Sequence, residues 1–400
     1  MSLFKKMVRV VIPAWKSSDP VERIAAITQL VDRELLESIL KKEENPQVKE
    51  SALYALNQLE LASLARKTLV ERERIEAVEQ LKNQILLAEL AKTLKDSPAR
   101  FEAVKKLEDQ KLLGAIARDS LDQDTRVAAI ERLDDERVLI EIALNDPHFG
   151  PRLSATAKVK SQKILSSVAR VDKDYMVRMA ALSKLTDQRL IATIAENDQS
   201  EQVQIRAIEI LNDQDLLKSI AFSDISNQAV LLATKKLQDR EVVKQIKDKH
   251  YQLGKKAYEK LKYDQAFPKF QMSAELGHPE AQFELATMYH LGQYVSQDIK
   301  SAFNWFKNSA QQGFAPAQHS LGIFYVFGDV VIRDETEAEK WWVKAAEQGF
   351  TQAQFDLGKL YATGQGIPKD KAAAKIWLTK AAEKGNLRAK AALIELIPVN

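Results

Sequence analysis

The chain has 400 residues, of which 45% are hydrophobic and 29% are charged, and it carries a formal net charge of +3 and no cysteine. Without cysteine, disulfides, thiol nucleophiles and thiolate metal sites are excluded. The small net charge, with acids and bases mixed along the chain, argues against a dedicated nucleic-acid binder, which usually carries a large basic excess.

Residues 1–17 form a short N-terminal segment in which Lys5, Lys6 and Arg9 lie among apolar residues. Such a basic amphipathic segment either covers the exposed face of the first repeat or makes a peripheral contact with an anionic membrane surface. Arg9 and Pro13 interrupt the apolar run, so we predict no secretory signal. No stretch approaches about 20 apolar residues, so we predict no spanning helix and expect a cytoplasmic protein.

Between residues 18 and 247 an alanine recurs with a period of 26 residues and one step of 25. The nine positions are Ala26, Ala52, Ala77, Ala103, Ala129, Ala155, Ala181, Ala207 and Ala233. Aliphatic residues follow one and four positions later, and a second apolar group begins nine positions later. Each spacing is typical of one stripe of a short helix, so the pattern predicts nine units of two helices each.

Predicted helix caps repeat with the same period. Seven positions before the alanine stand Asp19, Asn45, Asp96, Asp122, Asp174, Ser200 and Ser226, and six positions after it stand Asp32, Asp109, Asp135, Asp187, Asp213 and Asp239. These side chains can accept hydrogen bonds from the unpaired amides of a helix start. Val70 and His148 take the place of the first cap in units three and six. Helices of about ten residues are marginal alone, so they must bury their apolar stripes against neighbouring units.

This array resembles HEAT and HEAT-like repeats in a short form. The resemblance rests on the helix-pair period, the Asp caps and a recurrent basic residue such as Arg126 or Arg178. HEAT-like repeats are chiefly protein-interaction modules, and some HEAT-like proteins bind nucleic acid or are lyases.

A basic residue also recurs three positions before the alanine. The seven residues of this basic ladder are Arg23, Lys49, Arg74, Arg100, Arg126, Arg152 and Arg178. They fall near the first turn of each helix, where a cation opposes the helix dipole. One interpretation pairs them with acids of the adjacent unit, for which the Asp residues six positions after the alanine are candidates, as in the Asp–Arg ladders of HEAT-like families. The other is a binding surface for acidic ligands or nucleic-acid phosphates.

From residue 248 to 400 the period changes to 36. It is marked by Trp305, Trp341 and Trp377, by Gly277, Gly313, Gly349 and Gly385, by Gly292, Gly328 and Gly364, and by Asp298, Asp334 and Asp370. The glycines are predicted to end helices and the aspartates to cap the second helix of each unit. The tryptophans are predicted to fill the gaps between units.

These three copies resemble the Sel-one-like repeat, a relative of the tetratricopeptide repeat. The resemblance implies a protein or peptide partner held on a concave surface that the first helices line. Candidate groove residues are Gln282, Phe283, Gln318, His319, Gln354 and Phe355.

The sequence therefore predicts an all-α protein, a right-handed α-solenoid of stacked antiparallel helix pairs in two consecutive arrays, residues 18–247 and 248–400. No catalytic motif appears, and the five histidines lack ligand spacing, so we predict no metal, no cofactor and no small-molecule substrate. The expected function is a non-catalytic scaffold for a protein or peptide. The alternatives are nucleic-acid or acidic-surface binding through the basic ladder and, less favoured, an enzyme of the lyase or hydrolase type.

Overall fold

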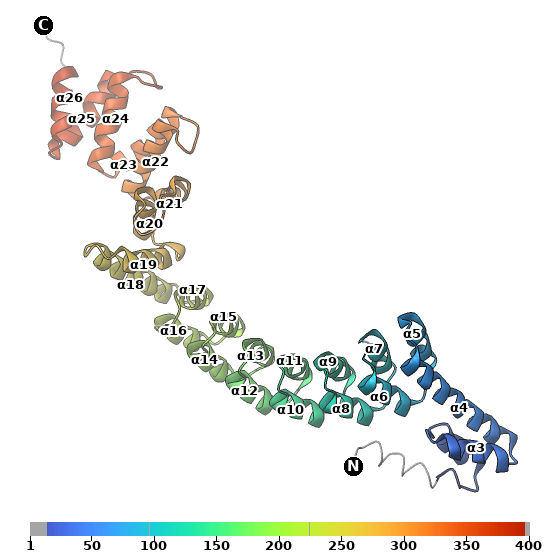
Figure 1. The fold of residues 1–400 in the computed structure, drawn as a ribbon. Helices are drawn as coiled ribbons and strands as arrows, with labels where there is room; N and C mark the ends of the chain where they lie inside the picture. The colour runs from blue at the N-terminus through green and yellow to red at the C-terminus, as the bar shows by residue number, and fades with distance from the viewer. Residues whose placement is uncertain (1–13, 96, 224, 397–400) are drawn as a thin grey trace. The chain divides into compact units, whose positions relative to one another are not determined.

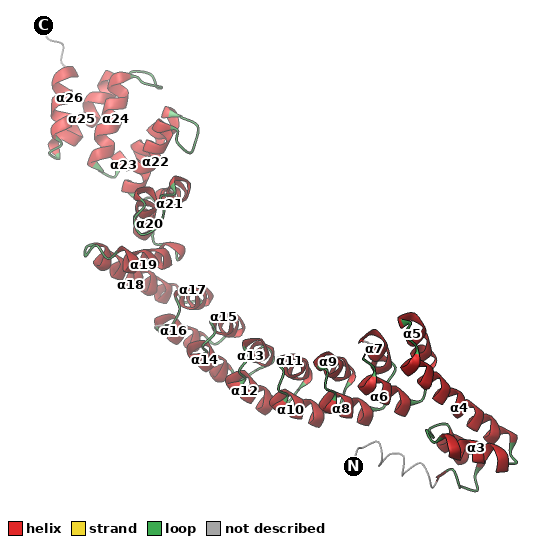
Figure 2. Ribbon diagram, in the orientation of Figure 1, coloured by secondary structure: helices red, strands yellow, loops and turns green. Residues whose placement is uncertain are grey.

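The computed structural model describes residues 14–95, 97–223 and 225–396. These residues form the helices α2 to α26 and no strand, which confirms the all-α class (Figure 1, Figure 2). The chain divides into two compact units, residues 1–210 and 211–400. Residues 1–13, most of the predicted N-terminal segment, lie outside the described residues.

The first unit contains fourteen described helices. They are α2 (Pro20–Ile27), α3 (Arg33–Lys42), α4 (Pro46–Lys67), α5 (Glu71–Gln80), α6 (Gln84–Thr93), α7 (Ser97–Lys105), α8 (Gln110–Asp119), α9 (Gln123–Arg132), α10 (Glu136–Asn145), α11 (Phe149–Lys158), α12 (Gln162–Val171), α13 (Tyr175–Leu182), α14 (Gln188–Asn197) and α15 (Glu201–Ile210).

Within this unit the helices stack as two rows. The helices α5, α7, α9, α11, α13 and α15 contact one another in that order, and α8, α10, α12 and α14 form the second row (Figure 1). The recurring alanines lie in the core between neighbours: Ala129, Ala155 and Ala181 are 0% exposed. A methyl group is the largest side chain that allows the backbones of neighbouring helices to approach this closely.

Most of the predicted caps are present. Asp122 accepts a hydrogen bond from the amide of Thr125 at the start of α9, and Asp135 accepts bonds from two amides at the start of α10. Val70 and His148, where the pattern breaks, make no side-chain cap bond. Asp96 lies outside the described residues. Local sequence therefore determines where these short helices begin.

Unit two of the repeat pattern departs from the predicted helix pair, because α4 is one continuous helix of 22 residues. Gln58 stands where other units carry the second aspartate cap, and a glutamine does not interrupt the helix. Its buried Oε1 instead accepts hydrogen bonds from the amides of Lys82 and Asn83, at 2.6 and 3.2 Å. The missing cap explains the fusion of the two predicted helices.

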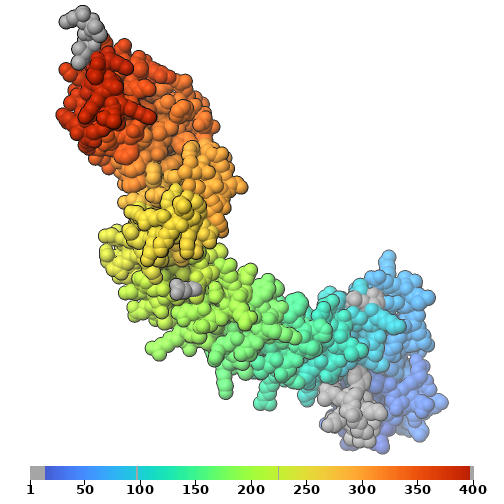
Figure 3. All heavy atoms as spheres, turned by 60° about the vertical axis from the view of Figure 1, so that its left-hand side comes forward, coloured from blue at the N-terminus to red at the C-terminus, as the bar shows by residue number. Residues whose placement is uncertain are grey.

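The second unit contains eleven described helices. They are α16 (Gln214–Phe222), α17 (Asn227–Lys236), α18 (Arg240–Tyr258), α19 (Tyr263–Glu275), α20 (Pro279–Leu291), α21 (Ile299–Gln311), α22 (Ala315–Phe327), α23 (Glu335–Glu347), α24 (Thr351–Thr363), α25 (Lys371–Glu383) and α26 (Leu387–Leu396). Each helix of this unit contacts the next one along the chain, and Figure 3 draws the atoms of the unit as spheres coloured up to red at the C-terminus.

The predicted limit between the two arrays, at residues 247/248, falls inside the continuous helix α18. It marks a change of sequence period within one helix. The division into compact units at residues 210/211 does not coincide with that limit, which rests on sequence period and stays a prediction.

The helix ends predicted from the 36-residue period are confirmed. Gly292, Gly328 and Gly364 end α20, α22 and α24 with φ of 67°, 76° and 68°. A left-handed backbone is least costly for glycine, so the residue type sets where these helices stop. Asp298, Asp334 and Asp370 cap α21, α23 and α25.

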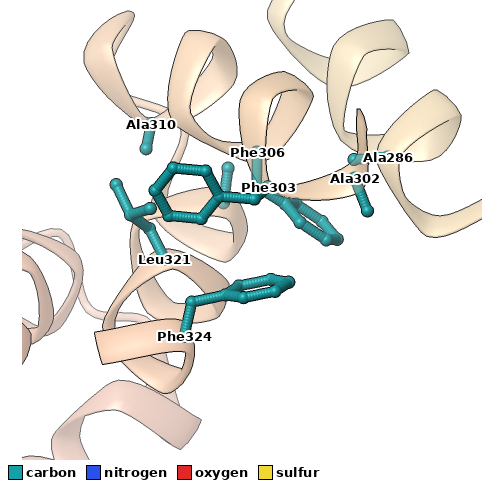
Figure 4. Packing of buried hydrophobic residues seen from close by; sticks show 8 residues of the cluster. Ala286, Ala302, Phe303, Phe306, Ala310, Leu321 and Phe324 are labelled. Carbon is teal, nitrogen blue, oxygen red and sulfur yellow. The ribbon is translucent and has the colours of Figure 1, made fainter. Parts of the chain in front are cut away.

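Aromatic side chains fill the core between the helix pairs of the 36-residue repeats. Figure 4 shows Phe303, Phe306 and Phe324 gathered with Leu321 between helices, and Trp305 packs against the same cluster. The predicted tryptophans are only half-buried, and Lys344 and Lys380 cover the rings of Trp341 and Trp377 at 4.2 and 4.3 Å.

The fully enclosed tryptophan is instead Trp342, with 6% exposure. Phe306 and Leu378 occupy the same repeat position in the neighbouring copies, with 5% and 0% exposure. The buried core position is thus the residue after the recurrent tryptophan, because on α23 this position faces α22 of the same helix pair and α24 of the next pair.

Candidate functional site

The basic ladder forms ion pairs between repeats in the first unit. Arg126 on α9 donates from Nε and Nη2 to the two carboxylate oxygens of Asp146, at 2.9 and 3.0 Å. Arg178 on α13 pairs with Asp198 in the same way, with both bonds at 2.7 Å. All four side chains are at least 88% buried, as their exposures are 5%, 5%, 12% and 6%.

Each of these arginines also donates a third hydrogen bond, from Nη1 to a backbone carbonyl. Nη1 of Arg126 donates to the carbonyl of Ser120 at 2.8 Å, and Nη1 of Arg152 donates to the carbonyl of Asp146 at 3.0 Å. The hydrogen bond to Asp172 raises the pKa of Arg152 above its ordinary value. The guanidinium donors thus meet carbonyl and carboxylate acceptors within the array, which offsets the unfavourable helix dipole.

Other members of the ladder make contacts of several kinds. Arg100 donates to Asp122 at 3.0 Å, and Arg23 lies 3.5 Å from Glu43. Arg74 donates to the carbonyl of Thr68 at 2.8 Å, and Lys49 is half-buried on α4.

The acids that pair with the ladder are not those expected from the sequence. The aspartates six positions after the alanine cap the second helices, as Asp135 does for α10. The partners Asp146 and Asp198 instead follow the second helix and begin the next unit, twenty residues after their arginine. The contacts favour the interpretation of the ladder as a bond between units. Its role as a binding surface stays a prediction.

A second ladder, made of glutamines, escaped the sequence analysis. Gln110 accepts a hydrogen bond from the amide of Asp134 at 2.8 Å and donates to the carbonyl of Arg132 at 3.2 Å. Gln162 repeats both bonds with Thr186 and Lys184, at 3.1 and 2.9 Å. Each glutamine directly follows a cap residue, and its two hydrogen bonds join it to the backbone of the turn between the helices of the next unit. Its 26-residue spacing was the signal that could have revealed it.

The glutamines among the candidate groove residues lie inside the second unit. Gln282, Gln318 and Gln354 are 5%, 4% and 3% exposed. Their amide groups donate to the carbonyls that end the preceding helix, those of Ala274, Ala310 and Ala346, at 3.1, 3.2 and 3.0 Å. Each of these carbonyls also accepts a hydrogen bond from the backbone amide of Gly277, Gly313 or Gly349, so the buried glutamine adds a second bond at the helix end.

The aromatic groove candidates are also packed. His319 is 7% exposed and lies 6.0 Å from the ring of Trp342, and its Nε2 is 2.8 Å from a carboxylate oxygen of Asp356. Phe283 packs edge-to-face on Phe306 at 5.4 Å. Phe355 is 8% exposed. Their role as groove residues stays a prediction.

An open apolar pocket lies beside these residues, between α22 and α24, and we call it the α22/α24 pocket. It has a volume of about 320 Å³, at the lower end of the range for ligand sites. Its apolar lining is Ile323, Val326, Phe327, Trp342 and Leu360, and its polar lining is Glu335, Asp356, Lys359, Thr363 and Gln365.

Helix geometry explains why this pocket exists. Ile323, Val326 and Phe327 stand three and four positions apart, which places them on one side of α22. Phe327 is the last residue before the left-handed Gly328, and its side chain is 70% exposed. Phe327 therefore adds exposed apolar surface to the apolar lining of the pocket, and contiguous exposed apolar surface is what marks a candidate contact site.

The carboxylates of the pocket are already paired. Nε of Arg333 donates to Oε1 of Glu335 at 2.5 Å. Asp356 accepts a hydrogen bond from Nε2 of Gln352 at 3.0 Å and is also bonded to His319. Lys359 has no such partner among the residues that the structure describes, so the free charge at the pocket is positive.

In the described ranges no three residues of the types His, Cys, Asp and Glu are grouped so that they could hold a metal ion. None of the described helices combines the length and apolarity required to span a membrane.

The repeated helix pairs, their caps and the contacts between successive pairs define an α-helical repeat protein of the solenoid class. Residues 279–314, 315–350 and 351–386 match the model of the Sel1 repeat family. Residues 279–386 of this chain thus belong to the Sel1 repeat family, and the HEAT-like resemblance of residues 18–247 stays a prediction.

The solved structures that are similar to the chain include the following three. A Sel1 repeat protein from Oxalobacter formigenes is 39% identical over 32% of this chain and 95% of that chain, with a TM-score of 0.30. A protective antigen of uropathogenic Escherichia coli with an SLR fold is 20% identical over 91% of this chain and 67% of that chain, with a TM-score of 0.36. An immunity protein from Pseudomonas aeruginosa is 18% identical over 52% of this chain and 81% of that chain, with a TM-score of 0.28. No curated protein sequence matches the chain.

Proposed function

We propose that this protein is a non-catalytic scaffold that binds a partner protein through its Sel1 repeats, with the α22/α24 pocket as the anchor site. The observation that carries the proposal is Phe327, a ring 70% exposed at the rim of an apolar pocket. Burial of such a ring against a partner removes apolar surface from water, which favours association.

The composition of the pocket supports a polypeptide ligand. Five of its ten lining residues are aliphatic or aromatic and five are polar or charged, so it can hold an apolar side chain and also orient the polar groups of the chain around it. The basic ladder offers less support for the alternative of nucleic-acid binding, since Arg126, Arg152 and Arg178 are paired and buried. A cytoplasmic location stays a prediction.

The proposal is tested in two steps. A partner is first recovered with the full chain from native lysate and identified, and the complex is then rebuilt from purified components and titrated by calorimetry. The titration compares the wild type with Phe327→Glu and with Ile332→Glu, a matched control at a residue that is 91% exposed and does not line the pocket.

We expect Phe327→Glu to weaken binding by about tenfold or more, because one apolar anchor commonly contributes over 1 kcal/mol. Ile332→Glu should leave the affinity within about twofold, as expected of a contact outside the binding site. Equal affinity of the two variants would place the contact surface elsewhere, and failure to rebuild any complex would contradict the scaffold function.

A further inference from the structure

A second pocket adjoins the first on the other side of α24, and we call it the α24/α26 pocket. It has a volume of about 530 Å³. Lys359 and Thr363 line both pockets, so the two are neighbours along one helix. Whatever occupies the α22/α24 pocket can therefore continue into this one.

The charge of the α24/α26 pocket is strongly positive. It is lined by Lys359, Lys369, Lys371 and Arg388, against a single carboxylate, that of Glu395. None of these five side chains forms an ion pair or a hydrogen bond with another described residue. Four unpaired cations around one hollow create a positive potential that attracts an anionic ligand.

The floor of this pocket is apolar. Phe355, Ala362, Ala391 and Ala392 contribute to its lining, and the ring of Phe355 is 8% exposed. Aliphatic stems of lysine and arginine lie along such surfaces and keep their charged ends in water. The site thus accepts a ligand with both carbon surface and negative charge.

We propose that the two pockets together bind one acidic segment of a partner protein, with an apolar side chain in the α22/α24 pocket and carboxylates against the cations of the α24/α26 pocket. This inference rests on the proposed function and specifies the chemistry of the partner. The carboxylates of the first pocket, Glu335 and Asp356, are held by Arg333, His319 and Gln352, so they oppose an acidic segment less than free acids would.

A polypeptide explains both pockets better than a phosphate backbone does. Aspartate and glutamate residues next to a leucine or phenylalanine place carboxylates and an apolar side chain within one short extended segment. A phosphate backbone meets the cations but offers no aliphatic group for Ile323, Val326 and Leu360. The cations of the α24/α26 pocket are expected to select acidic segments, because charges at the edge of an interface contribute mainly to specificity and to the association rate.

The test uses the full chain and a random-peptide phage library. Peptides enriched on the wild type are sequenced, synthesised with a fluorescent label and titrated by anisotropy. The same titration uses Lys369→Glu/Arg388→Glu, which alters only the α24/α26 pocket, and Phe327→Glu, which alters only the α22/α24 pocket. Lys375→Glu/Lys390→Glu is the matched control, since it makes the same change of net charge at exposed residues outside both pockets.

We expect the enriched peptides to combine an apolar residue with an excess of Asp and Glu. Lys369→Glu/Arg388→Glu should weaken their binding by about tenfold, and the control pair by less than about twofold. Raising NaCl from about 50 to about 500 mM should weaken wild-type binding, because exposed charges are screened.

The outcomes separate the two proposals. The acidic partner is contradicted if the peptides depend on Phe327 but carry no excess of acidic residues. It is also contradicted if Lys369→Glu/Arg388→Glu does not weaken their binding. In both cases the proposed scaffold function is unaffected. Absence of any peptide enriched on the wild type over Phe327→Glu contradicts both. A labelled single-stranded oligonucleotide is titrated in the same way. If it binds more tightly than the acidic peptides, and if Lys369→Glu/Arg388→Glu abolishes its binding, the pocket binds a phosphate backbone and the inference is wrong.

Discussion

Arg152 and Asp172 belong to successive repeats, and their side chains meet through two parallel hydrogen bonds. Nε and Nη2 of the arginine lie 2.8 and 2.9 Å from the two carboxylate oxygens, and the side chains are only 4% and 7% exposed. A neighbouring repeat is the main contact that any unit of such an array possesses. This pair therefore couples the stability of one unit to that of the next.

Asp172→Ala is expected to reduce the free energy of unfolding by about 3–5 kcal/mol, because it leaves the charge of Arg152 buried without its partner. Urea unfolding followed by circular dichroism measures the change. Glu76→Ala is the control: in its ion pair with Arg72 the side chains of Arg72 and Glu76 are 88% and 50% exposed, so solvent screens the pair and the loss should be far smaller. Similar losses in both variants would show that the buried pair has no special part in joining the units.

Gly322→Ala tests the close approach of α22 and α23. A Cβ atom at this position would lie 2.2 Å from Nε1 of Trp342, which is itself fixed by a 2.9 Å hydrogen bond to the carbonyl of His319. Overpacking of this kind costs about 1–3 kcal/mol, measured as a lower midpoint of urea unfolding.

The first copy of the repeat supplies a rescue for this variant. Ala286 and Phe306 occupy the positions of Gly322 and Trp342 there, and both are buried. Gly322→Ala/Trp342→Phe should therefore recover part of the stability that Gly322→Ala loses. Gly114→Ala is the control, because its nearest neighbour would be 3.6 Å away, and it should stabilise α8 by up to about 1 kcal/mol. A destabilised Gly114→Ala, or no rescue in the double variant, would contradict this account.

Gln110 tests the glutamine ladder. Gln110→Ala removes an acceptor for the amide of Asp134 and a donor to the carbonyl of Arg132, and should cost about 1–2 kcal/mol. Gln110→Glu keeps the acceptor, as Glu136 does in the next unit, where it accepts from the amides of Lys160 and Ser161 at 3.1 Å. The glutamate variant should therefore lose less stability than the alanine variant in the same urea titration. Equal losses in the two variants would mean that the amide donor, which both variants lack, matters here rather than the carbonyl acceptor.

His250 gives the second unit a pH dependence. It is 7% exposed on α18, and burial, followed by the charges of Lys269 and Lys249, lowers its pKa to about 4. In the unfolded chain the pKa is about 6.5. Between these values the unfolded state binds more protons, so stability falls as the pH drops from about 6.5 to about 4.

His250→Phe replaces the titratable imidazole with an aromatic ring that cannot be protonated. The unfolding free energy should fall between pH 7 and pH 4 by up to about 3 kcal/mol less in this variant than in the wild type. His290→Phe, at an exposed histidine, serves as the control. An identical pH profile for the wild type and His250→Phe would show that His250 is readily protonated in the folded protein.

Much of the local architecture was predictable from sequence alone. The periods of 26 and 36, the caps such as Asp122 and Asp334, and the helix-ending Gly328 depend on interactions within a few residues of the chain, so each leaves a readable pattern. Even the failures of the pattern at Val70 and His148 correspond to missing cap bonds.

Contacts between repeats were not predictable in this way. The partner of Arg152 is Asp172 rather than a cap aspartate, and the enclosed ring is Trp342 rather than Trp341. Both outcomes depend on how one helix pair rotates and translates against the next, which no local pattern encodes. The α22/α24 pocket is of the same kind, since Phe327 and Leu360 meet only once the repeats are stacked.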